Sequence, residues 1–195
     1  MVERIYLTGM IWVSLMIATA GAVLALAAGP KPPVETVPAV DLKRYSGRWY
    51  EIARFPNRFQ RSCAGDVMAT YTLRPDGKIT VLNECRTAEG RVKKATGTAR
   101  LADPRGAASK LKVTFFWPFS GDYWVIGLDP EYRWALVGDP DRDYLWLLSR
   151  EPKMDETLYG EIVARAAGQG FEISKLVRTK QSKESGSESS SPARE

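Results

Sequence analysis

Histidine is absent from this chain of 195 residues. The chain therefore lacks the side chain that most often transfers protons near neutral pH and most often binds metals. A Ser-His-Asp triad, a Cys-His pair and a histidine-based zinc site are excluded. Carboxylates or lysine alone can support some catalysis, so an enzyme stays open as an alternative. We expect a protein without catalytic residues, metal or cofactor.

Concentrated basic segments are missing as well. The chain has 28 Lys and Arg against 23 Asp and Glu, a formal net charge of +5. This small, dispersed excess does not indicate a partner made of nucleic acid. It fits contact with an anionic membrane surface or an acidic ligand headgroup, and it fits ordinary surface charge kept for solubility equally well.

Charge is absent from one long stretch near the N-terminus, residues 5–28. An A-x-A site, typical of signal-peptidase cleavage, stands at residues 25–27, and prolines at 30–33 then oppose helix. The stretch is also about long enough to span a bilayer. We expect residues 1–28 to be a signal peptide or an N-terminal membrane anchor, with the remainder exported to the periplasm or cell envelope. No cysteine ends the apolar stretch, so we expect no lipidation.

Cysteine is scarce, with only Cys63 and Cys85. An even pair in an exported protein favours a disulfide, because extracytoplasmic compartments are oxidising. The pair flanks an expected hairpin at residues 67–82, so a bridge would join the two ends of that hairpin. Two free, buried thiols are the alternative.

Composition divides the rest of the chain into three parts. Residues 29–40 are rich in Pro and Val and read as a linker, and residues 41–179 read as one folded domain. Residues 180–195 are a Ser/Lys/Glu tail of low complexity, which we expect to be disordered.

Apolar and polar residues alternate through most of the folded block, as Val67, Ala69 and Tyr71 do. A period of two is typical of strands, and signals such as Asp76-Gly77 mark the turns between them. Eight strands in unbroken order are expected at residues 49–55, 67–74, 79–82, 94–101, 110–115, 123–128, 133–137 and 144–149.

A single helix follows the strands. Asp155 can cap it, every fourth residue from 158 to 166 is apolar, and Gly168 or Gly170 ends it. A short last strand is expected at residues 171–177. The fold class is therefore all-β: an eight-stranded antiparallel up-and-down β-barrel with one C-terminal α-helix packed outside and a short last strand.

A barrel of this width either fills with side chains or holds one small ligand. The residues expected to face the barrel interior include small ones that leave room for a ligand and large apolar ones that form a wall around it. The small ones are Ala53, Ala69, Ala95, Gly97 and Ala99, and the large ones are Phe55, Tyr71, Val81, Val113 and Phe115. We expect these positions to bind a small hydrophobic ligand. A solid core at the same positions is the alternative.

Three motifs resemble those of the lipocalin family. Gly47-Arg48-Trp49-Tyr50 resembles its G-x-W-Y opening motif, residues 129–138 its second motif with the usual T-D-Y altered, and residues 147–150 its third. All three stand in the family's order. The closer resemblance, over about residues 41–179, is to bacterial lipocalin and its apolipoprotein D-like relatives, and segments such as Phe115-Phe116-Trp117-Pro118-Phe119 carry it.

The resemblance implies binding of fatty acids or lysophospholipids and a role in envelope lipid handling. The best-known bacterial members are outer-membrane lipoproteins, and this chain departs from them by lacking the lipobox cysteine. The Cys63–Cys85 pairing resembles a staple seen in some relatives. Whether the barrel forms a homodimer is left open.

One end of a closed barrel needs a plug. In the family motif, Arg150 closes over Trp49 beside Gly47, and a guanidinium stacked on an indole seals that end while the cation stays partly solvated. We read these residues as structural. The opposite end is expected to be built from the loop around Arg58 and from Trp117 and Phe119, where Arg54 and Arg58 could hold an anionic headgroup above an acyl chain.

Two rival interpretations remain. The barrel could be a membrane-tethered interaction module without a transported ligand. Alternatively, it could be an isomerase that uses Cys63, which a disulfide to Cys85 would prevent.

Overall fold

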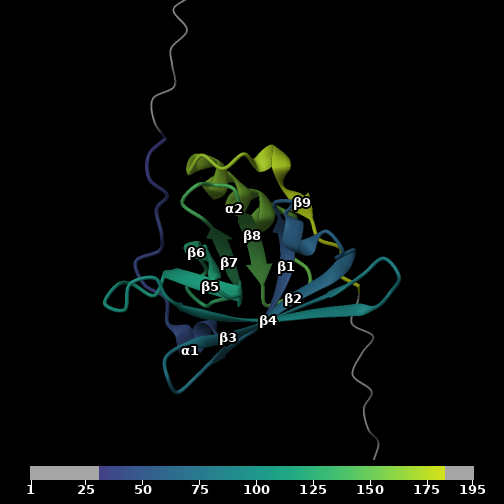
Figure 1. Cartoon of the computed structure of the whole chain (residues 1–195). Helices are drawn as coiled ribbons and strands as arrows, with labels where there is room; N and C mark the ends of the chain where they lie inside the picture. The colour runs from purple at the N-terminus through teal and green to yellow at the C-terminus, as the bar shows by residue number, and fades with distance from the viewer. Residues whose placement is uncertain (1–30, 183–195) are drawn as a thin grey trace, which may run out of the picture. The chain divides into compact units, whose positions relative to one another are not determined.

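The computed structural model describes residues 31–182, so the predicted signal or anchor at residues 1–28 lies outside the described residues. Nine strands, two α-helices and two short 3-10 helices make up this part (Figure 1). The strands are β1 Gly47–Arg54, β2 Gly65–Leu73, β3 Ile79–Arg86, β4 Val92–Leu101, β5 Lys110–Phe116, β6 Phe119–Leu128, β7 Trp134–Gly138, β8 Leu145–Ser149 and β9 Val177–Arg178. The helices are α1 Leu42–Tyr45 and α2 Glu156–Gly168, and the 3-10 turns are Arg58–Gln60 and Ile173–Lys175.

Strands β1 to β7 each pair antiparallel with the next strand along the chain, and β8 pairs with β1. The sheet therefore closes on itself, which removes the exposed edges that invite aggregation. The predicted up-and-down barrel of eight strands is confirmed. The predicted last strand is much shorter than expected, because residues 173–175 form a 3-10 turn and only Val177–Arg178 pair with β1.

Two separate apolar clusters form on the two sides of the barrel wall. The interior cluster includes Trp49, Tyr71 and Val81. The outer cluster lies between the wall and helix α2, where Ile162 and Ala166 are fully buried (Figure 1). Helix α2 begins after Asp155, whose carboxylate accepts from the Leu158 amide at 3.0 Å, so the predicted cap and the predicted outer position of the helix are confirmed.

A β-bulge interrupts β1 and shifts its alternation. The register with β8 slips between Glu51 and Ala53, so Trp49, Glu51 and then Arg54 face inward. Ala53 and Phe55, predicted to line the interior, pack instead in the outer cluster. The prediction was wrong because a bulge adds one residue to a strand and reverses which face every later side chain occupies.

Both ends of the folded block extend further than the sequence indicated. Residues 31–40, predicted to be a linker, lie against the barrel: Val34 and Val40 are buried and the Val37 amide donates to the Val125 carbonyl at 2.9 Å. Residues 180–182, predicted to be disordered, are also packed, since the Asp66 amide donates to the Lys180 carbonyl at 2.8 Å. The rest of the predicted tail, residues 183–195, lies outside the described residues.

Candidate functional site

A plug closes the end of the barrel where β1 begins. The guanidinium of Arg150 lies 3.8 Å from the centre of the Trp49 ring, and Trp49 is fully buried. Arg150 also donates to the carbonyl oxygens of Arg44, Tyr45, Ser46 and Arg48, which fastens helix α1 and the start of β1 across this end. The predicted stacking of the two residues is present.

Gly47 is part of this plug for a steric reason. Its φ is +98°, a conformation that favours glycine, and a Cβ there would lie 3.3 Å from Nη1 of Arg150. The indole Nε1 of Trp49 donates to the Tyr45 carbonyl at 2.8 Å, so the plug leaves that buried donor satisfied.

Three tyrosine hydroxyls meet in the interior just above the plug. Tyr123 shares a hydrogen bond of 2.8 Å with Tyr45 and one of 2.9 Å with Tyr71. Burial of the phenols raises the pKa of all three above the ordinary value, to about 12 for Tyr71. These groups therefore stay neutral at physiological pH and form a polar floor beneath the apolar side chains of the interior cluster.

The exposure of the inward-facing side chains rises from the plug toward the opposite end. Along β5, Leu111 is buried, whereas Val113 and Phe115 are only half-buried. The same change runs from Leu148 to Trp146 in β8. Because these side chains point into the barrel, solvent reaches the interior from this end, which we call the open end.

The small residues of β4 do not all leave free space. Gly97 is buried, and a Cβ there would lie 2.8 Å from the Phe115 ring, so that ring already occupies the room above it. Ala99 is fully buried in the interior cluster. Ala95, nearer the open end, is half-buried and keeps accessible surface. Ala69, Tyr71 and Val81 belong to the interior cluster.

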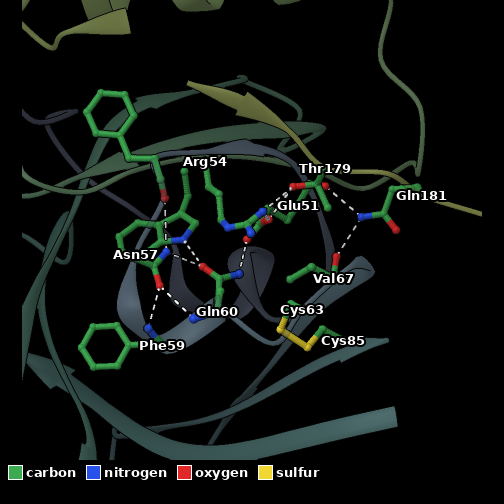
Figure 2. A network of polar contacts seen from close by, with 12 residues as sticks. Glu51, Arg54, Asn57, Phe59, Gln60, Cys63, Val67, Cys85, Thr179 and Gln181 are labelled. Carbon is green, nitrogen blue, oxygen red and sulfur yellow. Dashed lines mark hydrogen bonds and ion pairs between the residues drawn. A yellow bond between two sulfur atoms is a disulfide. The ribbon is translucent and has the colours of Figure 1, made fainter. Parts of the chain in front are cut away.

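A polar network surrounds the Glu51 carboxylate near the open end (Figure 2). Arg54 forms an ion pair of 3.0 Å with Glu51, and Gln60 and Thr179 also donate to its two oxygens. The carbonyl oxygen of the Gln60 side chain accepts from the Trp146 indole at 3.1 Å. One carboxylate thereby joins β1, the β1–β2 loop and residues 179–181, which we call the C-terminal segment.

The charge of Arg54, predicted to hold a headgroup, is thus already paired with Glu51. Its Nε is buried without a hydrogen-bond partner among the described residues. Glu51 was not predicted as an interior residue. The sequence contained a signal for it, because in an alternating strand the residue two positions after the inward-facing Trp49 also faces inward.

The C-terminal segment seals a seam in the barrel wall. β1 and β2 pair only through residues 47–50 and 68–71, and they separate toward the open end. In the gap, the Gln181 side-chain amide donates to the carbonyls of Glu51 at 2.8 Å and Val67 at 2.9 Å (Figure 2). Residues 179–181 therefore bridge the two strands where the strands themselves do not pair.

Loops at the open end carry the remaining predicted residues. Arg58 stacks on the Phe59 ring at 4.9 Å. Trp117 and Phe119 form the tip of the β5–β6 hairpin, with exposed fractions of 89% and 78%. They therefore point away from the interior rather than lining it. The predicted Cys63–Cys85 disulfide is present and ties the β1–β2 loop to β3.

The described residues also form recesses outside the barrel interior. Two recesses of about 270 and 300 Å³ lie on the outer wall, and neither is lined by the small interior residues. Among residues 31–182, no cluster of three acidic, cysteine or histidine side chains could hold a metal ion. No helix in the same range is long and apolar enough to cross a bilayer.

Comparisons with known proteins agree with this geometry. A family model described as a lipocalin-like domain matches residues 40–181. Temperature-induced lipocalin-1 of Arabidopsis thaliana is 47% identical, over 78% of this chain and 85% of its own length. The outer membrane lipoprotein Blc of Escherichia coli K12 is 45% identical, over 84% and 93%. Bovine apolipoprotein D is 31% identical, over 84% and 88%.

Solved structures show the same fold at lower identity. Insecticyanin from the tobacco hornworm Manduca sexta matches with a TM-score of 0.63 and 20% identity, over 80% of this chain and 88% of insecticyanin. This chain thus combines the plug, the closed barrel and the outer helix with a sequence that is 31–47% identical to bacterial, plant and animal relatives. The chain belongs to the lipocalin family, in the subgroup of bacterial lipocalin and apolipoprotein D.

Proposed function

We propose that the protein binds a fatty acid or a lysophospholipid in the interior of the barrel and carries or stores it in the bacterial cell envelope. Membership of the lipocalin family supports the coarser part, binding of a small hydrophobic ligand. The observation that carries the proposal is that inward-facing side chains at the open end, including Val113, Phe115 and Trp146, are only half-buried. Apolar surface left open to water gains about 25 cal/mol per Å² when a ligand covers it.

Arg58 is the better candidate for an anionic headgroup. Arg54 is already neutralised by Glu51, whereas Arg58 has no carboxylate partner among the described residues. A headgroup bound at Arg58 would stay near water while the acyl chain enters the barrel. A phosphate or carboxylate oxygen there would gain a charge-assisted hydrogen bond.

Export and the absence of catalysis complete the proposal. The relatives named outer membrane lipoproteins support a location in the envelope, and the lack of a lipobox cysteine supports a form that is not lipidated. The isomerase alternative needs a free thiolate at Cys63, but this residue is bonded to Cys85.

Ligand binding can be tested by filling the interior at its open end. Ala95→Phe places a ring on the inward phase of β4, and Thr96→Phe places the same ring on the adjacent outward position. We expect oleate and lysophosphatidylglycerol to quench the tryptophan fluorescence of wild type and of Thr96→Phe. Both ligands should bind Ala95→Phe at least about tenfold more weakly, which corresponds to a difference of roughly 1.4 kcal/mol in binding free energy.

Equal binding by all three proteins would contradict a site in the interior, and no binding to wild type would contradict the carrier function. The headgroup is tested by Arg58→Gln against Arg54→Gln. We expect Arg58→Gln to weaken the binding of lysophosphatidylglycerol while the protein stays folded. Arg54→Gln should instead destabilise the fold, because Arg54 is the ion-pair partner of Glu51 in the buried network.

A further inference from the structure

The two edges of the β1–β2 seam are each fastened to the rest of the barrel wall. On one side, β1 pairs with β8 as far as Arg54, which lies opposite Trp146. On the other side, β2 pairs with β3 from its first residue, Gly65, and the Cys63–Cys85 disulfide ties the chain just before β2 to the same strand. The seam therefore has two firm edges, which the C-terminal segment bridges toward the open end.

The C-terminal segment is attached firmly to β1. The strand that precedes the segment, β9, pairs with β1 through Arg178 opposite Ala53. The Thr179 amide donates to the Ile52 carbonyl at 2.9 Å, and the Thr179 hydroxyl donates to the buried carboxylate of Glu51. Backbone pairing and a buried charge thus hold this side of the segment, and they make it a natural hinge.

The attachment of the same segment to β2 is weaker. The Asp66 amide donates to the Lys180 carbonyl at 2.8 Å, and the Gln181 side chain donates to the Val67 carbonyl at 2.9 Å (Figure 2). Asp66 also accepts from the amide and the hydroxyl of Ser182, at 2.6 and 2.8 Å. Every residue from β9 to Ser182 is half-buried or exposed, so no buried apolar side chain anchors this side. Hydrogen bonds near solvent without apolar packing open more readily than a ladder inside a sheet.

The interior of the barrel lies directly behind the C-terminal segment. Glu51 and Val67, one on each edge of the seam, are buried, with exposed fractions of 3% and 6%. Because the segment occupies the position of a strand between β1 and β2, its departure leaves the room of one strand, about 4.8 Å, between the two edges. An extended acyl chain fits such a gap side-on, and the gap is continuous with the open end.

We propose that the C-terminal segment is a side gate through which the acyl chain of the ligand enters and leaves the barrel. The segment swings on its attachment to β1 and detaches from β2, so the seam opens from the open end down to the pair of Tyr50 and Met68. A lipid then slides its chain sideways into the interior while its headgroup stays in water. Axial entry would instead draw the whole chain past the inward-facing Phe115 ring. This inference rests on the proposed function, because it describes how the ligand reaches the same interior.

The gate is tested by weakening its attachment to β2. Gln181→Ala/Ser182→Ala removes two side-chain hydrogen bonds across the edge that opens and changes no side chain of the interior cluster. The contacts that close the gate are the same with and without ligand, so loosening them changes the rates of exchange and not the affinity. We expect the association and dissociation rate constants of oleate both to rise at least about fivefold, the effect of one lost hydrogen bond, and the dissociation constant to change less than about twofold.

Stopped-flow tryptophan fluorescence of the full chain measures both rate constants. Association is followed on mixing with oleate, and dissociation on mixing the complex with excess methyl-β-cyclodextrin, which takes up the released oleate. Ser174→Ala is the matched control, because it removes an exposed hydroxyl from the 3-10 turn before β9 and should leave both rate constants unchanged. Circular dichroism checks that each variant is folded.

Hydrogen exchange in the absence of ligand reports the motion itself. The Asp66 amide donates across the edge that opens, and the Thr179 amide donates at the hinge. In wild type we expect the Asp66 amide to be at least about tenfold less protected than the Thr179 amide. In Gln181→Ala/Ser182→Ala, exchange at Asp66 should accelerate by the same factor as the two rate constants of oleate, because one open population governs all three.

Unchanged rate constants in Gln181→Ala/Ser182→Ala would overturn the gate. Faster dissociation at an unchanged association rate, with affinity weakened in step, would overturn it as well, because the segment would then be a fixed part of the binding wall. Equal protection of the Asp66 and Thr179 amides would exclude the hinge and the gate with it. Absence of oleate binding to wild type contradicts the proposed function, whereas binding with unchanged rate constants in the variant contradicts the gate alone.

Discussion

Single tryptophans show how differently the two ends of the barrel are built. Trp49 is fully buried under the Arg150 guanidinium, and Trp117 is 89% exposed at the hairpin tip. The first is held by stacking and by a hydrogen bond to the Tyr45 carbonyl. The second has no ring partner or hydrogen bond among the described residues. The same side chain therefore contributes to stability at one end and is free for contact at the other.

Replacement of the two tryptophans should separate these roles. Trp49→Ala leaves a cavity in the plug and removes the surface on which Arg150 stacks, so we expect a loss of roughly 3–5 kcal/mol in the free energy of unfolding. Trp117→Ala should change it by less than about 0.5 kcal/mol. Urea unfolding followed by circular dichroism measures both, and similar losses in the two variants would contradict the assignment of Trp49 to the plug.

The interior tyrosines predict a loss of stability at alkaline pH. The pKa of Tyr71 is about 12 in the folded protein against 10.0 ordinarily, because its phenol is buried. The unfolded chain therefore releases this proton first, and the contribution that is complete below pH 10 disappears as the pH rises to about 12. The shift corresponds to roughly 3 kcal/mol.

Tyr71→Phe lacks this group. We expect the stability advantage of wild type over Tyr71→Phe to shrink by that amount across the same pH range, as measured by urea unfolding at each pH. An advantage that stays constant would show that the Tyr71 phenol ionises normally.

At this scale the sequence predicted some interior residues and missed others. The inward phase of β2, β3 and β4 follows from simple alternation, so Tyr71 and Val81 were placed correctly. Ala53 and Phe55 were not, because the bulge in β1 depends on the pairing with β8 and has no signature in the local pattern.

The junctions between neighbouring strands of the barrel differ in the contacts that close them. Seven successive hairpin pairings need only neighbouring strands, and alternation with turn signals predicts them well. The junction of β1 with β2 is partial and is completed by residues 179–181. The sequence could not predict this, because Lys180 acts through its backbone carbonyl and Gln181 through a single amide, and a polar composition gives no indication of either contact.

Gly65 tests the closure of this junction. A Cβ at Gly65 would lie 2.7 Å from the Lys180 carbonyl oxygen, whereas nothing lies within 4 Å of the same position at Gly121. Gly65→Ala must displace the C-terminal segment, and we expect it to cost roughly 1–3 kcal/mol. Gly121→Ala should cost less than about 1 kcal/mol.

Hydrogen exchange provides the local measurement. The amides of Asp66 and Thr179, which donate across the junction, should exchange faster in Gly65→Ala only. Unchanged exchange in that variant would contradict the close approach of Lys180.

At the largest scale, the domain formed by residues 31–182 is a barrel with one sealed end and one end that water enters. This polarity follows from Gly47, Trp49 and Arg150, all of which lie in recognisable motifs, so the sequence predicted it. The exposed position of Trp117 and Phe119 was not predicted, because an aromatic residue at a hairpin tip can turn inward or outward without any change in the alternation of the strands.

A ligand that binds only the folded barrel must stabilise the whole domain. At a free oleate concentration about 100 times the dissociation constant, the gain is roughly 2.7 kcal/mol. We expect the melting temperature of wild type to rise with oleate concentration and that of Ala95→Phe to rise about half as much or less, because its weaker binding gains at most about 1.4 kcal/mol at the same concentration. A parallel rise in both would place the ligand outside the interior.

The seam between β1 and β2 also has a consequence for how the protein is made. The residues that complete the wall, 179–181, follow every strand in the sequence, yet they contact β1, which begins at residue 47. A growing chain that has not yet reached residue 179 lacks them. The wall can therefore be completed only after nearly the whole domain has been synthesised, and until then β1 and β2 keep unpaired backbone groups at this seam.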